Sequence, residues 1–356
     1  MFYILSNNTF SRAELEHFGT IKNIHYGDIL IKFGDTLDAT NADIPYIKDN
    51  LKFKADYLQN GDLIIADTAE DYTAGKSTEI YNICDAKVIS GLHTIPCRPQ
   101  IKFAEKYLGY YTNSPAFRTQ LLSLLQGIKV FSISKSNLNN TNICYPSLSE
   151  QQKIADFLSL VDARIEKQRL LVESLKKYKR GALSRIFNDV LETVKLSDIS
   201  NFISSTRTLS TTLNSNKGIY PVYDAAGISG YIDHYDIDSD YITIVKDGSG
   251  VGRLQKCDKK SSFIGTLGAL VAKNCTTDFL YAVLQTIDFS KFVTGMAIPH
   301  IYYKDYKNTL LPFPCEIKQH SISKFFKKID EYIENETQKL SNILKYKQGL
   351  LQQMFI

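Results

Sequence analysis

The feature of this sequence that most constrains its fold is an internal repeat with a constant offset. Residues 146–187 match residues 314–355 without a gap, so each matched pair lies 168 positions apart. Identical pairs include Pro146 and Pro314, Gln151 and Gln319, Phe157 and Phe325, Asp162 and Asp330, Lys177 and Lys345, Tyr178 and Tyr346, and Gly181 and Gly349. One structural unit therefore occurs twice, and any architecture for this chain has to contain it twice.

Both repeated segments are predicted to form long helices, because neither holds a proline after its first residue and each holds a single glycine. Apolar residues recur at alternate steps of four and three, which indicates a heptad seam. The seam residues are Ile154, Leu158, Val161, Ile165, Val172 and Leu175 in the first copy and Ile322, Phe326, Ile329, Ile333, Leu340 and Ile343 in the second.

Polar residues interrupt the seam at the same two steps in both copies, namely Gln168 and Lys179 in the first and Glu336 and Lys347 in the second. A generic amphipathic helix would explain one apolar stripe but not these shared interruptions. The pattern therefore favours two antiparallel helices that pack on each other as a coiled coil around a pseudo-twofold axis.

Two details of the helices carry further expectations. Gly181 and Gly349 lie inside the helical pattern, where glycine costs about 1 kcal/mol relative to alanine. We expect a close approach of two helix backbones at these glycines; the alternative is that each marks a helix end. Ser149 and Gln152 have the spacing of a capping box at the start of the first helix.

The segments outside the helices are rich in β-branched and aromatic residues broken by Gly, Asn and Asp clusters, as in sheet domains. They are also distantly related: residues 61–77 resemble 240–253 as a strand, a polar hairpin and a basic residue, and residues 89–95 resemble 264–270. The expected fold is α+β with twisted mixed or antiparallel sheets. The expected division is a first sheet domain 1–145, a helix 146–187, a linker 188–194, a second sheet domain 195–313 and a helix 314–356.

Composition narrows the class of protein. The 356 residues exceed one domain of about 150 residues. No apolar run approaches about 18 residues and the first residues lack a signal-peptide pattern, so we expect a soluble, cytoplasmic protein without a membrane partner. The net charge of +4 permits a polyanionic partner without requiring one. The six cysteines form no CxxC pair, so neither a metal site nor a disulfide framework is expected.

Candidate catalytic motifs fail on inspection. Residues 74–77 end like a phosphate-binding loop, but Glu70 stands where its first glycine belongs. Residues 248–252 are too short for a dinucleotide fingerprint and indicate a tight hairpin. The Asn/Asp-Pro-Pro-aromatic loop of a DNA amino-methyltransferase is missing, since no two prolines are adjacent. The fragment 85–87 of a nuclease pattern lacks a locatable second carboxylate. We therefore expect no catalytic residue in this chain.

The phrases SLSEQQKIADFLSLVD and LKKYKRGALSRIF, with the repeat and the heptads, resemble the specificity subunits of type I restriction-modification systems. Residues 195–200 and 218–233 also resemble the start of a target-recognition domain of that family. The second helix departs from the pattern, with Lys318 for Glu150 and Ser323 for Ala155.

The resemblance implies a non-catalytic reader of double-stranded DNA, with two target-recognition domains separated by antiparallel helices. Two methyltransferase subunits would clasp the helices, and these partners, not this chain, would bind S-adenosylmethionine. Motor and nuclease subunits would join for restriction. A helix of about 38 residues is roughly 57 Å long, enough to hold two reading domains more than one turn of B-DNA apart. Two divergent domains on this pseudo-twofold scaffold predict a two-part asymmetric target with a spacer that the protein does not contact.

The candidate DNA contacts are polar, basic and aromatic residues of hairpins and of the segments before the helices. They are Lys76, Ser77, Lys135, Asn137 and Asn139 in the first domain, and Lys246, Ser249, Arg253, Tyr302, Tyr303 and Lys304 in the second. An ordinary solvated role is equally compatible with any one of them.

Two other function classes stay open at this point. A single-chain modification or restriction enzyme would transfer methyl groups from S-adenosylmethionine when purified alone. A structural coiled-coil adaptor would show no sequence preference on DNA, but it would leave the duplication and divergence of two sheet domains unexplained.

Overall fold

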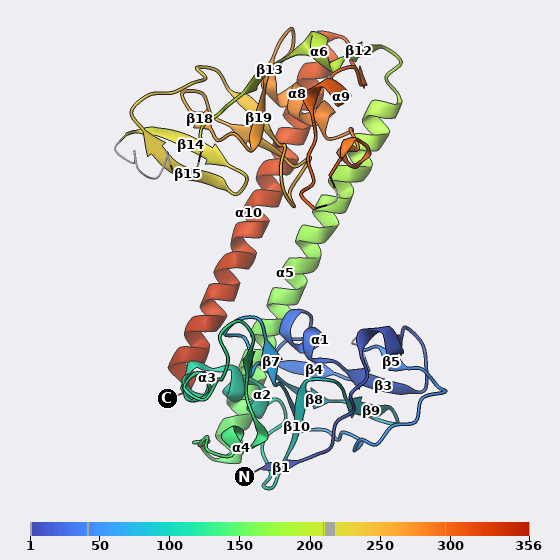
Figure 1. Cartoon of the computed structure of the whole chain (residues 1–356), viewed down its shortest axis with the longest axis vertical. Coiled ribbons are helices and arrows are strands. Elements are labelled where there is room, and N and C mark those ends of the chain that lie inside the picture. The colour runs from blue at the N-terminus through green and yellow to red at the C-terminus, as the bar shows by residue number, and fades with distance from the viewer. Residues whose placement is uncertain (1, 41–42, 209, 211–217, 296, 356) are drawn as a thin grey trace. The chain divides into compact units, whose positions relative to one another are not determined.

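The computed structural model describes residues 2–40, 43–208, 210, 218–295 and 297–355, which form two compact units. Unit 1 combines residues 1–168 with 339–356, and unit 2 is residues 169–338. Figure 1 shows the two long helices, α5 (Leu148–Asn188) and α10 (Glu316–Met354), each of which contributes one part to each unit. Both long helices predicted from the repeat are thus confirmed.

Unit 1 carries a mixed sheet in the order β1-β10-β6-β8-β4, a sheet in the order β2-β5-β3-β9 and the small pair β11-β7. Its elements are β1 (Phe2–Ile4), β2 (Leu15–Glu16), β3 (Ile21–Ile24), α1 (Tyr26–Ile31), β4 (Thr36–Asp38), β5 (Tyr46–Ile47), β6 (Leu63–Ala66), β7 (Thr68–Ala69), β8 (Ser77–Tyr81), β9 (Lys87–Ser90), β10 (Thr94–Pro99), α2 (Tyr107–Asn113), α3 (Pro115–Leu122), β11 (Phe131–Ser132) and α4 (Lys135–Leu138).

Unit 2 carries sheets in the orders β13-β19-β16-β17 and β15-β14-β18 and the pair β12-β20. Its elements are β12 (Thr193–Lys195), α6 (Leu196–Ile199), β13 (Ser200–Ser204), β14 (Tyr220–Asp224), β15 (Gly227–Ile232), β16 (Tyr241–Val245), β17 (Leu254–Cys257), β18 (Ser262–Phe263), β19 (Leu267–Ala272), α8 (Thr277–Leu284), α9 (Tyr303–Tyr306) and β20 (Leu310–Pro312).

The main sheets of the two units share one topology. The antiparallel hairpin β6–β8 corresponds to β16–β17, and β10 and β19 pair with the first strand of each hairpin. An antiparallel edge strand, β1 or β13, completes each order. The parallel pair β4–β8 adds a fifth strand to the main sheet of unit 1 and makes it mixed, and the parallel pair β14–β18 makes the smaller sheet β15-β14-β18 of unit 2 mixed. The α+β class and the distant relation between the two sheet domains, both predicted from the sequence, are confirmed.

In unit 1, the start of α5 and the end of α10 run antiparallel and complete the core of the sheet domain. Leu158 of α5 and Phe355 lie in one buried cluster with Tyr107 of α2. Farther along α5, Asp162 accepts a hydrogen bond from Lys347 of α10. Lys347 also pairs with Asp35, 2.7 Å away, so the ion pair joins both helices to the sheet domain.

The same arrangement recurs in unit 2 with the roles of the helices exchanged. Phe187 of α5 stacks on Phe326 of α10 with ring centroids 6.4 Å apart, and Lys179 pairs with Asp330. Because these residues are the repeat equivalents of Phe355, Lys347 and Asp162, the two polar interruptions Lys179 and Lys347 are explained as interhelical ion pairs.

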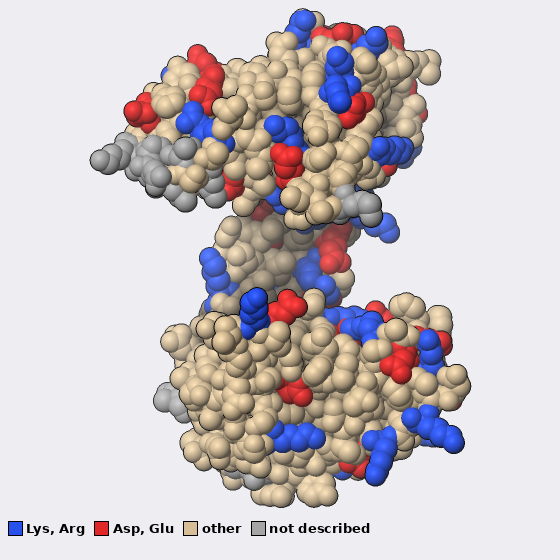
Figure 2. Space-filling model, in the orientation of Figure 1, with Lys and Arg blue, Asp and Glu red and all other residues tan. Residues whose placement is uncertain are grey.

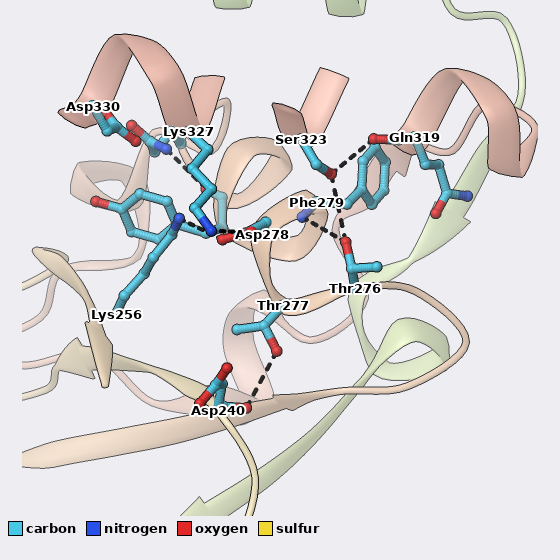
Figure 3. Close-up of polar contacts among 12 residues, drawn as sticks. Asp240, Lys256, Thr276, Thr277, Asp278, Phe279, Gln319, Ser323, Lys327 and Asp330 are labelled. Carbon is cyan, nitrogen blue, oxygen red and sulfur yellow. Dashed lines mark hydrogen bonds and ion pairs between the residues drawn. The ribbon is translucent and has the colours of Figure 1, made fainter. Parts of the chain in front are cut away.

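The helix α8 docks on α10 through its first turn (Figure 3). The hydroxyl of Thr276 accepts a hydrogen bond from the Phe279 N–H at 3.2 Å and lies 3.5 Å from the hydroxyl of Ser323. Asp278 pairs with Lys256 at 2.6 Å and lies 4.0 Å from Lys327 of α10. These contacts attach the sheet domain of unit 2 to α10.

The twelve predicted seam residues are all buried or half-buried. Their pairing across each whole helix stays a prediction, because each helix is divided between the two units. None of the helices in the described ranges, the two long ones included, combines the length and apolar character needed to cross a membrane.

The helix starts and the glycines differ from the sequence expectations. The Ser147 hydroxyl accepts from the N–H of Glu150 at 3.4 Å, so Ser147, and not Ser149, caps α5. Gln151 and Gln319 each donate to the carbonyl of the proline five positions earlier, at 2.9 and 2.8 Å. This repeated bond gives the repeated proline and glutamine a structural reason.

Both expectations for Gly181 and Gly349 are wrong. Gly181 is exposed and Gly349 half-buried, and a Cβ on either would meet no described neighbour within 4 Å, so no backbone packs closely there. The helices also continue past them to Asn188 and Met354.

Candidate nucleic-acid interface

In unit 2, the hairpin loop between β16 and β17 packs beside the segment that precedes α9. The N–H of Ile301 donates to the Lys246 carbonyl at 3.0 Å, and the N–H of Gly248 donates to the Pro299 carbonyl at 2.9 Å. These bonds bring two groups of predicted contacts together, namely Lys246 and Ser249 on the hairpin and the residues from Tyr302 onward.

We call the packing of the hairpin loop against this segment, through the Ile301–Lys246 and Gly248–Pro299 bonds, the junction of unit 2. An exposed aromatic and basic cluster follows it in the sequence. Tyr302 lies 4.8 Å from the ring of His300, and the Lys304 ammonium group lies 5.2 Å from the Tyr302 ring. Tyr302 and Lys304 are exposed, as is Ser249. The cluster therefore offers a cation, a π face and hydroxyls on one surface, which are groups that contact phosphates and base edges.

Unit 1 has an equivalent junction between its hairpin loop and the segment before α4, formed by different residues. The N–H of Ile133 donates to the Asp67 carbonyl at 2.8 Å, and β11 pairs with β7 inside the hairpin loop between β6 and β8. Tyr72 at the tip of that loop packs against Phe131 with ring centroids 4.7 Å apart. Ile133 and Ile301 are repeat equivalents, so both junctions belong to one repeated frame.

A closed loop precedes each junction. We name residues 126–132 the first tip loop and the described residues 294–295 and 297–300 the second. Reciprocal backbone bonds close each loop: Gln126 and Ser132 exchange bonds of 2.9 and 2.8 Å, and Thr294 and His300 exchange two of 2.8 Å. Gly127 and Gly295 have positive φ angles of 122° and 89°. A Cβ there would collide with the carbonyl of Val130 or Ile298, so both positions require glycine.

The tip loops lie upstream of the repeated segments 146–187 and 314–355, so these segments do not predict them. The offset of 168 in fact extends upstream, with identity at Gly127 and Gly295, Ile133 and Ile301, Asn140 and Asn308, and Thr141 and Thr309. These four scattered identities were the available signal. The exposed aromatic Tyr72 was also missed, since nothing in its local pattern distinguishes it from a core tyrosine.

The two predicted contacts on β8 and just before it are corrected. Ser77 has no exposed surface, and its hydroxyl lies 2.7 Å from that of Thr112. Lys76 is half-buried and donates to the carbonyls of Leu30 and Phe33 at 3.0 and 3.3 Å, and burial lowers its pKa. Both side chains point into unit 1, so we do not include either residue in the proposed interface.

The remaining predicted residues divide into engaged and exposed ones. Tyr303 stacks on Phe202 with ring centroids 4.3 Å apart, and Arg253 donates to the Ala225 carbonyl. Asn137 donates to the Leu124 carbonyl at 3.1 Å. Lys135 and Asn139 are exposed at and just after α4, and Lys246 is half-buried on its hairpin. Contact with DNA stays a proposal for the exposed group.

Charge alone does not mark the interface. On the face drawn in Figure 2, Lys and Arg side chains are scattered among Asp and Glu in both units. Among the residues that the structure describes, no group of three or more His, Cys, Asp or Glu side chains could hold a metal ion. The candidate site is therefore defined by the arrangement of its loops.

Comparison with known families identifies both halves of the chain. The family described as "Type I restriction modification DNA specificity domain" matches residues 4–173 and 188–345. A curated relative, the StySPI specificity subunit of a type I restriction enzyme from Salmonella potsdam, is 24% identical over 157 residues, covering 43% of this chain and 34% of that protein. The aligned stretch thus spans about a third of the relative's length.

Two solved structures have a similar fold. The S subunit of a type I restriction-modification system from M. genitalium is 16% identical, with a TM-score of 0.58 over 100% of this chain and 94% of that one. A structure from work on complex assembly and conformational transition of the type I R-M system is 16% identical, with a TM-score of 0.53 over 89% of each chain. At this identity the likeness concerns the fold alone.

Proposed function

The chain belongs to the type I restriction-modification DNA specificity family, and from this premise we propose that it is the non-catalytic, cytoplasmic subunit that reads DNA for a methyltransferase and restriction complex. The observation that carries the proposal is the repeated frame of hairpin, tip loop and junction, which bears different side chains in the two units. Because the same backbone arrangement presents different side chains in the two units, each unit can recognise a different half-site of a two-part target.

Each exposed group has a role that follows from its chemistry. The ammonium groups of Lys135 and Lys304 are suited to phosphates, which position the protein on the duplex. The Asn139 amide and the Ser249 hydroxyl are suited to base edges in the major groove. Tyr302, held between His300 and Lys304, offers an aromatic face and a hydroxyl for either purpose.

The methyltransferase subunits are proposed to dock on an exposed apolar face of the helices. In unit 1, Phe157 and Leu160 of α5 and Tyr346 of α10 line one groove, although Leu160 is 71% and Tyr346 58% exposed. Exposed apolar side chains gathered in a groove are typical of protein interaction sites.

The repeat supports a proposal of two docked partners. In unit 2, the equivalents Phe325 and Tyr178 are exposed as well. Two copies of one exposed aromatic pair suit two copies of one partner, and we assign them to two methyltransferase subunits that bring bound S-adenosylmethionine. Lys328 and Tyr332 replace Leu160 and Arg164 in unit 2, so the two faces are similar and not identical.

Replacing the aromatic pair in one unit is expected to remove one methyltransferase subunit from the complex. The variant Phe157→Ser with Tyr346→Ser loses the copy at unit 1, and Phe325→Ser with Tyr178→Ser loses the copy at unit 2, because each pair supplies the apolar contact. Native mass spectrometry measures the stoichiometry. Phe18→Ser, at an 86% exposed phenylalanine of the sheet domain, is the control. Full occupancy in all variants would exclude this docking face.

The proposed function itself is tested by mapping methylated adenine in cells that contain the methyltransferase subunit with and without this chain. We expect a two-part asymmetric motif that disappears when the chain is removed. Methylation that persists unchanged without the chain would reject the reader role and favour a structural adaptor. Methyl transfer by the purified chain alone would instead favour a single-chain enzyme.

A further inference from the structure

Both tip loops expose large aliphatic side chains at their apex. Ile128 is 94% and Val130 51% exposed in the first tip loop, and Ile298, the repeat equivalent of Val130, is 66% exposed in the second. Single exposed aliphatic residues are common on protein surfaces. Here, however, the equivalent positions Val130 and Ile298 carry one in both units, although the preceding equivalents Lys129 and Ala297 differ.

The loops are built to hold these side chains away from the core. The reciprocal backbone bonds of 2.8–2.9 Å close each loop at its base, and the left-handed glycine turns the chain back on itself. A residue at the apex of such a closed loop is held away from the sheet core of its own unit. The backbone conformation of the loop therefore keeps the apex side chain exposed, where a second molecule can contact it.

The surroundings of the tip loops favour DNA as that molecule. Lys129 lies at the apex between Ile128 and Val130, and Lys135 follows the junction; both lysines are exposed. The second tip loop ends at His300, beside the Tyr302 and Lys304 cluster. Aliphatic side chains on loops that adjoin lysines, whose ammonium groups are suited to phosphates, match the way proteins touch thymine methyl groups or enter a base step.

We propose that the two tip loops press Ile128 with Val130, and Ile298, against the apolar surface of DNA bases, one loop at each half-site. This inference rests on the proposed DNA-reading function and adds an apolar element to it. Each tip loop contributes affinity and base preference in its own half-site, beside the polar contacts of the hairpin.

The test uses the complete complex of this chain with its methyltransferase subunits. Ile128→Ser and Ile298→Ser are expected to weaken binding to the cognate duplex by about 10-fold or more, the effect of losing one base contact. The methylation motif of each variant is expected to lose base preference in one half-site only, a different half for each. Ile31→Ser in unit 1 and Leu191→Ser in unit 2 remove aliphatic residues that are 89% and 93% exposed outside the tip loops, and should bind as the parent does.

A duplex with uracil in place of thymine distinguishes the two kinds of contact. If the tip loop touches a thymine methyl group, the parent complex binds the uracil duplex more weakly than the thymine duplex. The tip variant then binds both duplexes equally. If the tip enters a base step, the replacement has little effect on either, and the variant still binds weakly.

The outcomes separate the inference from the function on which it rests. If the parent complex reads no sequence, the proposed function fails. If the parent reads its target and the tip variants match the controls, the inference is overturned. Loss of a methyltransferase subunit from the tip variants, seen by native mass spectrometry, would overturn it too, because the loops would then contact protein.

Discussion

Phe355→Ala is expected to destabilise unit 1 by about 3–5 kcal/mol while leaving unit 2 unchanged. Phe355 is 4% exposed, and its ring packs edge-on against Tyr107 and Tyr111 of α2 at centroid distances of 5.7 and 5.6 Å. The last residues of the chain thus complete the core of a domain formed by the first ones. Alanine would leave a cavity between α2 and the end of α10.

The matched control is Phe187→Ala, the repeat equivalent in unit 2. Phe187 is 3% exposed and contacts Phe279 and Phe326, so its loss is expected to destabilise unit 2 by a similar amount and to spare unit 1. Hydrogen–deuterium exchange reads the two units separately, through β6 and β10 in unit 1 and β16 and β19 in unit 2. Faster exchange in both units from either single change would contradict this assignment of cores.

Lys347→Met is expected to destabilise unit 1 by about 3–5 kcal/mol at neutral pH, because it leaves the largely buried carboxylate of Asp35 and the half-buried carboxylate of Asp162 without their cation. Lys347 is 14% exposed and pairs with Asp35, which is 13% exposed, and with Asp162. Burial by itself lowers the pKa of Lys347, but the two carboxylates outweigh burial, so the pKa is raised and the lysine is charged.

The cost of Lys347→Met is expected to shrink at acidic pH. Burial raises the pKa of Asp35, and Lys347 opposes that effect, so losing the lysine raises the pKa further. A carboxyl with a raised pKa in the native state binds its proton more readily there than in the unfolded chain. Protonation therefore stabilises the variant as the pH falls. Urea unfolding at pH 5 and pH 8 measures this difference, and an equal cost at both would contradict the account.

Lys179→Met is the matched comparison in unit 2. Lys179 pairs with Asp330, which is 28% exposed. Removing Lys179 therefore leaves one carboxylate without its cation, whereas removing Lys347 leaves two. A smaller loss of stability than for Lys347→Met is expected in the same urea series. The ranking would be reversed if the ion pair of unit 2 were the more desolvated one.

Sequence periodicity was sufficient wherever local rules and one repeat set the outcome. The heptad spacing and the absence of interior proline predicted both long helices to within about two residues, because a helix depends on neighbours three and four positions away. The duplicated hairpins were also predicted, since alternating strands joined by a polar glycine turn form from local contacts.

Tertiary structure decided which of the predicted polar residues face solvent. Lys76 and Ser77 belong to a predicted hairpin, yet residues of α1 and α2 provide the hydrogen-bond partners of their side chains. The same holds for Tyr303, which stacks on Phe202 from a strand about a hundred residues earlier. Such partners are distant in the sequence, so no local pattern indicates whether a lysine or tyrosine is satisfied inside the protein.

The sequence by itself determined the two helices, the duplication and the family, since these depend on short-range spacing and on identities at a fixed offset. Only the tertiary structure decided that the last helical turns of α10 belong to the core of the first domain, that Lys347 neutralises Asp35, and that Ile128 and Ile298 stand exposed on closed loops. The physical reason is that burial and charge pairing are set by residues that meet only when the chain folds.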